Sequence, residues 1–185
     1  MTTFYYTSFS STFESFTIVW KEIDSNVLIQ RLFLSDNNAK SETRAYELFD
    51  NVRKGSSKEI DEHGKKVQQF LEGNKTTFDL KALDFNRCSE IQKKVLIAEY
   101  NIPRGWISTY KRIVNHIGIK NGARVVGNSL ARNPFPIFIP YHRAIKSDGT
   151  LGGYQGGLEM KRTLLEMEGV KILEKGKVLT DKIHY

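Results

Sequence analysis

Few residues of this chain could carry out chemistry. A single cysteine, Cys88, stands among 185 residues, which excludes an internal disulfide and fits a reducing compartment. We expect a buried thiol there rather than a reactive one. Four histidines are present: His63, His116, His142 and His184. They are scattered and lack cysteine companions at zinc-binding spacing, so no metal and no cofactor is expected. The remaining candidate is the run Ile139-Pro140-Tyr141-His142-Arg143.

Charge is distributed unevenly along the chain. Residues 1–85 hold 11 Lys and Arg against 13 Asp and Glu, whereas residues 86–185 hold 17 against 8. A positive excess confined to one half indicates a surface that binds a polyanion, most simply nucleic acid. The alternative is a generally basic protein from an unusual host.

The overall composition, 39% hydrophobic and 26% charged, is that of an ordinary globular protein. No apolar run approaches the roughly 20 residues that cross a bilayer. Residues 1–15 are rich in aromatic and hydroxyl side chains and do not have the form of a secretory signal. We therefore expect no membrane association and a cytoplasmic location, at the nucleoid or, in a eukaryote, in the nucleus.

The first half of the chain is expected to form a small α/β unit. Two β-rich runs flank the turn signal Asp24-Ser25-Asn26 and predict a hairpin. Two apolar runs predict helices, the second ending at Gly73-Asn74. The expected strands are residues 16–20, 27–34 and 77–80, and the expected helices include residues 45–49 and 67–71. No chemistry is evident here, so this unit is expected to be a stabilising platform.

A helix is expected directly after Cys88. Ser89 and Gln92 have the form of a capping box, in which Ser bonds forward and Gln reaches back to the start of the helix. The apolar face comprises Ile91, Val95 and Leu96. The helix must end before Pro103, because proline interrupts helical hydrogen bonding.

Two further helices form a candidate helix-turn-helix. Ser108 is expected to cap the first, and residues 118–121 form the break. The second, residues 122–132, ends at Asn133-Pro134. The inner face of the first contains Ile113, Val114 and Ile117. Two short helices joined by a Gly-containing turn are typical of this motif, although any helical bundle could supply the same pattern.

The remainder is expected to be a loop, a glycine-rich segment and a last helix at residues 158–168, closed by Gly169. Residues 171–185 form a mixed basic and apolar tail without a clear assignment. The expected domains are thus residues 1–85 and 86–170, followed by this tail.

This second half resembles the O6-alkylguanine-DNA alkyltransferases, closely over residues 70–169 and more loosely before them. That family has Arg-x-Val-Gly, Asn-Pro, Pro-Cys-His-Arg, Gly-x-Tyr-x-Gly-Gly and Glu-Gly in this order. The matching residues here are Arg124-Val125-Val126-Gly127, Asn133-Pro134, Pro140-Tyr141-His142-Arg143, Gly152-Gly153-Tyr154-Gln155-Gly156-Gly157 and Glu168-Gly169. The resemblance implies an α/β fold class: a small RNase H-like α/β domain followed by a mostly helical helix-turn-helix domain.

The resemblance also implies how DNA would be held. An alkylated guanine is rotated out of the duplex, and Arg124 would fill the gap in the base stack. The helix bearing Arg124 would lie in the minor groove, where the small residues Ala123 and Gly127 permit close approach. Tyr110 would contact the flipped nucleotide, and Ser147 is carried over as a further DNA-binding residue.

The same resemblance implies a proton relay. In active relatives the histidine takes the thiol proton through a water, and the glutamate orients the imidazole, as in triads. Here these residues would be His142 and Glu168, with Asn133 holding the turn after the DNA-binding helix. Tyr141, however, stands where the family has its nucleophilic cysteine.

Tyrosine is a poor substitute for the thiol. Its unperturbed pKa is about 10, against about 8.5 for cysteine, and its oxygen lies farther from the backbone. An aromatic ring can still stack on a base, which contributes roughly 1–3 kcal/mol. The chain is therefore similar to alkyltransferase-like proteins, which bind O6-alkylguanine without repairing it. The expected lesion pocket comprises Tyr110, Pro136, Tyr141, Tyr154 and Gln155.

The expected function is binding of double-stranded DNA that carries alkylated guanine, by a monomer that transfers nothing and hands the lesion to repair proteins. Two alternatives stay open. One is a methyltransferase whose nucleophile has been replaced or whose phenol accepts the alkyl group. The other is a helix-turn-helix regulator that reads only DNA sequence and is indifferent to damage.

Overall fold

The structure is a computed structural model that describes residues 3–24, 26–119 and 122–185. It contains two compact units. The first comprises Met1–Arg87 with Pro134–Phe138, and the second comprises Cys88–Asn133 with Ile139–Tyr185. The expected separate tail, residues 171–185, thus belongs to the second unit, and a short segment of the second half of the sequence is grouped with the first.

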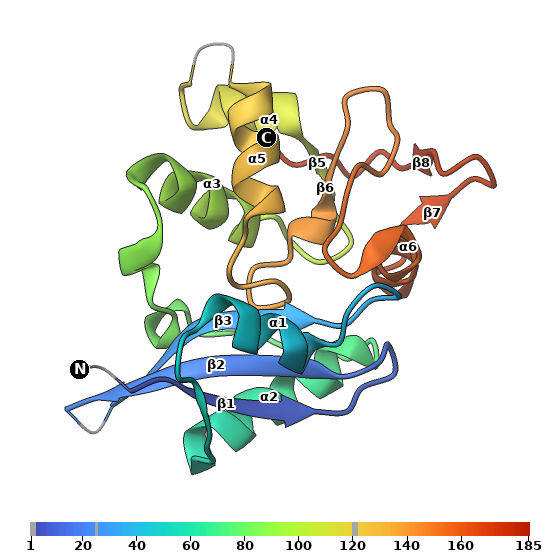
Figure 1. Cartoon of the computed structure of the whole chain (residues 1–185). Coiled ribbons are helices and arrows are strands. Elements are labelled where there is room, and N and C mark those ends of the chain that lie inside the picture. The colour runs from blue at the N-terminus through green and yellow to red at the C-terminus, as the bar shows by residue number, and fades with distance from the viewer. Residues whose placement is uncertain (1–2, 25, 120–121) are drawn as a thin grey trace. The chain divides into compact units, whose positions relative to one another are not determined.

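The first unit is built on a four-stranded sheet of order β3-β2-β1-β4 (Figure 1). Strand β1 (Tyr5–Phe9) runs antiparallel to β2 (Phe16–Ile23), and β2 runs antiparallel to β3 (Asn26–Leu34). Strand β4 (Arg53–Lys54) joins the other edge of β1 in parallel. The predicted hairpin is therefore confirmed for β2 and β3; Ser25 of its turn lies outside the described residues. The strand within residues 1–15 was not predicted.

Helices α1 (Ser41–Leu48) and α2 (Lys58–Leu71) lie on opposite faces of this sheet (Figure 1). The α1 side is a core of Tyr6, Val19, Phe33, Ala45, Phe49 and Val52. On the α2 side, Gly64 lies directly against Phe9, since a Cβ on Gly64 would come within 2.2 Å of the Phe9 ring. Alternation of side chains along β1–β3 explains why each face receives its own helix.

The predicted strand at residues 77–80 is wrong. The chain forms a short 3-10 helix, η1 (Leu80–Ala82), because the Asp79 carboxylate accepts a hydrogen bond from the Lys81 backbone N–H at 2.9 Å. Aspartate satisfies its neighbours' backbone groups in this way and so favours turns over strands. A second 3-10 helix, η2 (Phe85–Arg87), follows.

The second unit contains three helices in succession: α3 (Glu90–Tyr100), α4 (Tyr110–His116) and α5 (Ala123–Ala131). The expected helix-turn-helix is α4 and α5; part of its break, residues 120–121, lies outside the described residues. Thr109 rather than Ser108 caps α4, accepting from the Arg112 N–H at 3.2 Å. Ser108 lies one position too early, in β5 (Ser108–Thr109), and its hydroxyl donates instead to the His184 carbonyl at 2.9 Å. Ile117 follows the helix rather than belonging to it.

The predicted capping box at α3 is half correct. The Ser89 hydroxyl accepts from the Gln92 N–H at 3.2 Å, as expected. The Gln92 side chain, however, does not reach back to Ser89. Its amide donates instead to the carbonyls of Ser129 and Arg132 at the end of α5.

The rest of the second unit surrounds the Tyr-His-Arg run. That run is the 3-10 helix η3 (Tyr141–Arg143), and it continues into β6 (Ala144–Ile145), which pairs in parallel with β5. Helix α6 (Gly157–Met167) and a hairpin of β7 (Lys171–Ile172) and β8 (Val178–Leu179) complete the unit. Their core comprises Ile107, Ile145, Leu151, Leu165, Val170, Ile172 and Val178.

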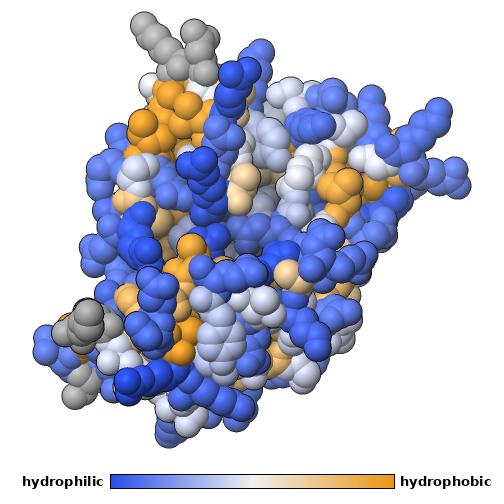
Figure 2. Space-filling view, viewed as in Figure 1, coloured by the Kyte–Doolittle hydropathy of each residue, from blue (hydrophilic) through white to orange (hydrophobic). Residues whose placement is uncertain are grey.

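The visible surface is largely hydrophilic, with smaller apolar areas between the charged side chains (Figure 2). Among the described residues, no helix is both long enough and apolar enough to cross a bilayer.

Candidate functional site

A pocket of about 440 Å³ opens in the second unit. Three tyrosines line it: Tyr110, Tyr141 and Tyr154. Helix α5 supplies a second wall, made of Gly127, Leu130 and Ala131, and the glycine-rich loop supplies Gly153 and Gln155. Its volume lies in the range of about 300–1,000 Å³ typical of small-ligand sites. An aromatic, mostly apolar lining suits a planar ring.

Tyr141 is fixed inside this pocket. Its side chain is only 2% exposed, and its ring stacks on Tyr154 with centroids 4.5 Å apart and an interplanar angle of 26°. The hydroxyl accepts a hydrogen bond from the Gln155 backbone N–H at 2.6 Å. The phenol oxygen therefore lies against the far loop, well beyond the reach of a shorter side chain at the same position.

No residue that lines the pocket in the described part of the chain carries a thiol. Cys88 is buried, 7% exposed, at the start of α3 and does not contribute to the lining. The expectation that Cys88 is buried is confirmed. Its low reactivity stays a prediction. The pocket therefore lacks the atom that an alkyl transfer to sulfur would require.

Tyr110 is placed by a close approach of the glycine-rich loop. Gly152 has a φ of +71°, which favours glycine, and a Cβ there would come within 2.5 Å of the Tyr110 hydroxyl. Burial raises the pKa of Tyr110, and Glu99 raises it further. The phenol is therefore protonated at neutral pH and is suited to donate a hydrogen bond into the pocket.

His142 and Glu168 contact one another as the resemblance implied. The imidazole Nε2 and the Glu168 Oε1 are 3.0 Å apart, and His142 is completely buried. Burial lowers the pKa of His142, and the nearby carboxylate offsets this only in part. A neutral imidazole that donates from Nε2 to the carboxylate has the orientation of a base in a relay.

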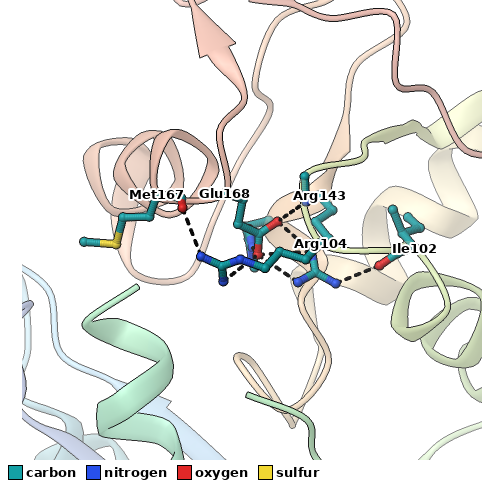
Figure 3. Close-up of polar contacts among 7 residues, drawn as sticks. Ile102, Arg104, Arg143, Met167 and Glu168 are labelled. Atoms are coloured by element: carbon teal, nitrogen blue, oxygen red, sulfur yellow. Dashed lines mark hydrogen bonds and ion pairs between the residues drawn. The ribbon is translucent and has the colours of Figure 1, made fainter. Parts of the chain in front are cut away.

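Arg143 holds Glu168 in place (Figure 3). Its Nε donates to Oε2 at 2.9 Å and its Nη2 to Oε1 at 2.8 Å, the two-pronged geometry that guanidinium groups favour with carboxylates. Burial raises the pKa of Glu168, but His142 and Arg143 outweigh burial and hold it well below its usual range. Sequence reasoning gave Arg143 no role, although its place in the Tyr-His-Arg run was a signal.

The turn between α3 and β5 surrounds the same carboxylate. The Gly105 N–H donates to Glu168 Oε2 at 3.1 Å, and the Ile102 carbonyl accepts from Arg143 Nη1 at 2.7 Å. Arg104 donates to the Met167 carbonyl at 2.9 Å and so caps the end of α6 (Figure 3). Gly105 has a φ of +75°, and a Cβ there would lie 2.9 Å from the Glu168 carbonyl oxygen.

The expected DNA-binding residues lie at different depths. Arg124 and Ala123 are exposed at the start of α5, Gly127 is half-buried at the pocket, and Ser147 is exposed on the loop after β6. Asn133 is fully buried, and its amide donates to the Ile139 carbonyl at 3.4 Å.

Pro136 is the exception among the expected pocket residues. It belongs to Pro134–Phe138, which is grouped with the first unit, and it does not line the pocket. The resemblance implied that Pro136 lines the pocket, whereas residues 134–138 are grouped with the first unit.

Two buried ionisable side chains, Glu99 on α3 and Lys161 on α6, were also missed. Lys161 on α6 donates to the Ala144 carbonyl at 2.6 Å, directly after the Tyr-His-Arg run. Burial raises the pKa of Glu99 to about 8 against the pull of Lys161 and Arg143, and burial lowers that of Lys161 to about 8. Helical spacing was the available signal, because Glu99 and Lys161 each lie three and four residues from buried apolar neighbours.

Known proteins with similar sequences and structures share this arrangement of elements. Residues 90–170 match the family described as 6-O-methylguanine DNA methyltransferase, DNA binding domain. A methylated-DNA–protein-cysteine methyltransferase of Methanothermobacter thermautotrophicus is 47% identical over 106 residues, which cover 57% of this chain and 59% of that protein. The protein of the same name from Methanosarcina acetivorans is 37% identical over 108 residues, covering 58% and 68%.

The crystal structure of Mycobacterium tuberculosis OGT in complex with DNA has a TM-score of 0.69 to this structure and 28% identity, covering 89% of this chain and 92% of that one. The expected fold class, an N-terminal α/β domain with a C-terminal helical domain, is thereby confirmed. The match spans 59% of the length of the Methanothermobacter relative, less than two thirds. In sequence and in fold, the chain belongs to the O6-methylguanine-DNA methyltransferase family.

Proposed function

We propose that this protein binds double-stranded DNA and receives an O6-alkylated guanine in the pocket of Tyr110, Tyr141 and Tyr154, without transferring the alkyl group. The observation that carries this proposal is the position of Tyr141. A stacked, buried phenol whose oxygen accepts a hydrogen bond from the Gln155 N–H stands at the position where, by resemblance, the family has its nucleophilic cysteine.

The shape and chemistry of the pocket support a flipped base as the ligand. Aromatic faces contribute roughly 1–3 kcal/mol for each base stacked on them. Tyr110 adds a polar group to the pocket wall. The small residues Gly127 and Ala131 leave room beside α5 where the base would enter. Removing a base from the duplex costs a few kcal/mol, which such contacts can offset.

Double-stranded DNA as the partner is supported by charge. The exposed Arg124 begins the helix whose other end forms the pocket wall, so the group proposed to enter the stack and the site that receives the base lie on one helix. The positive excess of residues 86–185 falls mostly within the same unit. The Mycobacterium tuberculosis relative was crystallised in complex with DNA.

The test compares two duplexes of identical sequence, one carrying a single O6-methylguanine. Equilibrium binding at a fixed, moderate salt concentration should be tighter to the damaged duplex, because only that duplex gains the pocket contacts. Equal affinity for the two duplexes would remove lesion recognition from the proposal. It would favour a regulator that reads shape and charge alone.

A second candidate, alkyl transfer, is favoured by the names of the relatives, which are methylated-DNA–protein-cysteine methyltransferases. In this chain the acceptor would have to be the Tyr141 oxygen, which would bond the alkyl carbon while the bond from that carbon to guanine O6 breaks. Intact-mass measurement after incubation with damaged duplex separates the candidates. A methyl-sized gain mapped to Tyr141 would establish transfer, and an unchanged mass is expected.

A further inference from the structure

Gln155 makes two sets of contacts that point in different directions. Its backbone N–H donates to the Tyr141 hydroxyl at 2.6 Å, inside the pocket. Its side-chain amide donates to the Asn133 carbonyl at 2.8 Å and to the Ala131 carbonyl at 3.3 Å. Those carbonyls lie at the C-terminal end of α5, where helices leave acceptors without intrahelical partners.

Helix α5 contributes both to the proposed DNA-binding surface and to the lesion pocket. Arg124 lies in its first turn and is exposed, and Leu130 and Ala131 in its last turn line the pocket. A shift of the helix on docking to DNA would therefore move the carbonyls that Gln155 holds. Through the same residue it would move the donor that holds the Tyr141 hydroxyl.

Gln92 offers a matched comparison. Its amide also donates to carbonyls at the end of α5, those of Arg132 at 3.2 Å and Ser129 at 3.4 Å. Gln92 lies on α3 and does not line the pocket. The two glutamines thus support the same helix end, but only Gln155 also contacts an aromatic wall of the pocket.

We propose that Gln155 is a positioning residue that couples docking of α5 on DNA to the geometry of the lesion pocket, so that discrimination between damaged and intact duplex depends on its side-chain amide. This inference rests on the proposed function. It names the residue by which the lesion site responds to the DNA-binding helix.

The experiment measures the ratio of dissociation constants for intact and O6-methylguanine duplexes in the full chain and in two variants. Gln155→Met keeps the length of the side chain and the backbone N–H but removes the amide. We expect its ratio to fall about tenfold, the effect of losing one to two neutral hydrogen bonds. Gln92→Ala should keep the wild-type ratio.

Base extrusion supplies a second readout. A 2-aminopurine placed beside the lesion brightens when its neighbour leaves the stack, and this signal should be weaker with Gln155→Met at saturating protein than with Gln92→Ala. If Gln155→Met is not recovered folded, Gln155→Glu replaces it, since a carboxylate has the same shape and cannot donate to those carbonyls; the same loss is expected.

The outcomes separate the inference from the function on which it rests. A wild-type ratio of the two dissociation constants near one would contradict the proposed function itself. A wild-type protein that discriminates, with Gln155→Met discriminating equally well, would overturn the coupling and leave the function standing. An equal loss in Gln155→Met and Gln92→Ala would also overturn it, because general support of the helix end would then explain both.

Discussion

At the scale of single residues, tyrosine differs from cysteine in reach as well as in acidity. The Tyr141 hydroxyl contacts the Gln155 N–H across the pocket, whereas a cysteine sulfur would stop near the backbone beside His142. The residues proposed as a relay are in contact with one another: a neutral buried imidazole, an ionised glutamate and the Arg143 guanidinium. Tyr141 is the residue of the Pro-Tyr-His-Arg run that departs from the family motif.

Tyr141→Cys should therefore regain some alkyl transfer. A thiol at this position would give its proton to the His142 relay, its sulfur would bond the alkyl carbon, and the bond to guanine O6 would break. Intact-mass measurement with O6-methylguanine duplex should show a gain of one methyl group on residue 141. Tyr141→Ser is the control and should gain nothing; an inert Tyr141→Cys would mean that the relay cannot activate a thiol here.

His142 and Glu168 should each make the folded protein less stable in acid. The pKa of folded His142 lies below its ordinary 6.5, so the unfolded chain takes up a proton that the folded protein refuses as pH falls through 6.5. Glu168 acts in the same direction below 4.5, where the unfolded carboxyl binds a proton first. Glu99 acts in the opposite direction, because its folded carboxyl, with a pKa raised to about 8, binds a proton before the unfolded one does.

Urea titrations of the wild type and His142→Gln would isolate the contribution of His142. Between pH 7 and pH 5.5 the free energy of unfolding of the variant should rise relative to that of the wild type, because one proton-binding site of the unfolded chain is gone. His63 and His184 have pKa values lowered in the same direction and contribute equally to both proteins. Identical slopes for the two proteins would contradict the assignment of a lowered pKa to His142.

At the scale of elements, a short turn positions Arg143 and Glu168. Ile102, Arg104 and Gly105 precede β5 and together contact Arg143, the end of α6 and Glu168 (Figure 3). Helix α6 thus ends where its last residues are held by a segment more than 60 positions earlier in the chain. The turn thus holds the Glu168 carboxylate and its Arg143 partner through these hydrogen bonds.

Gly105→Ala should destabilise the protein by about 1–3 kcal/mol, from a left-handed backbone together with a close contact. The φ is +75°, and the new Cβ would lie 2.9 Å from the Glu168 carbonyl oxygen. Gly176→Ala is the matched control, since Gly176 has a φ of +73° and no heavy atom within 4 Å of a Cβ. Urea unfolding should show the larger loss for Gly105→Ala; equal losses would mean that the contact is relieved at no cost.

At the scale of the whole molecule, binding to DNA should depend strongly on salt. Each phosphate neutralised by Lys or Arg releases counterions, so the logarithm of affinity falls linearly with the logarithm of salt concentration. The positive charge lies in residues 86–185, where Lys and Arg outnumber Asp and Glu by 17 to 8. We expect this half of the chain to account for nearly all of the salt dependence.

Arg124→Ala should weaken binding and reduce the salt slope by about 1 if the guanidinium meets phosphate as it enters the duplex. Lys58→Ala, an exposed change at the start of α2 in the first unit, should leave the slope unchanged. Fluorescence anisotropy over a series of salt concentrations measures both. An unchanged slope for Arg124→Ala would place its side chain away from the phosphates.

Much of the secondary structure could be predicted from local patterns. The β2–β3 hairpin, the Ser89 cap of α3 and the succession α4–α5 all depend on residues within a few positions of one another. The prediction at residues 77–80 failed because the Asp79 side chain competes for the backbone there. The Gln92 prediction failed because a distant helix end offered the amide better acceptors.

The sequence by itself determined the family motifs, the absence of a thiol at position 141 and the pairing of His142 with a distant glutamate. Only the tertiary structure decided that the Tyr141 hydroxyl meets Gln155, that Arg143 grips Glu168 and that Pro136 lies outside the pocket. The physical reason is range. Caps and turns are closed by neighbours three or four residues away, whereas the Tyr141–Gln155 and Arg143–Glu168 contacts join residues 14 and 25 positions apart, whose meeting depends on how the whole unit folds.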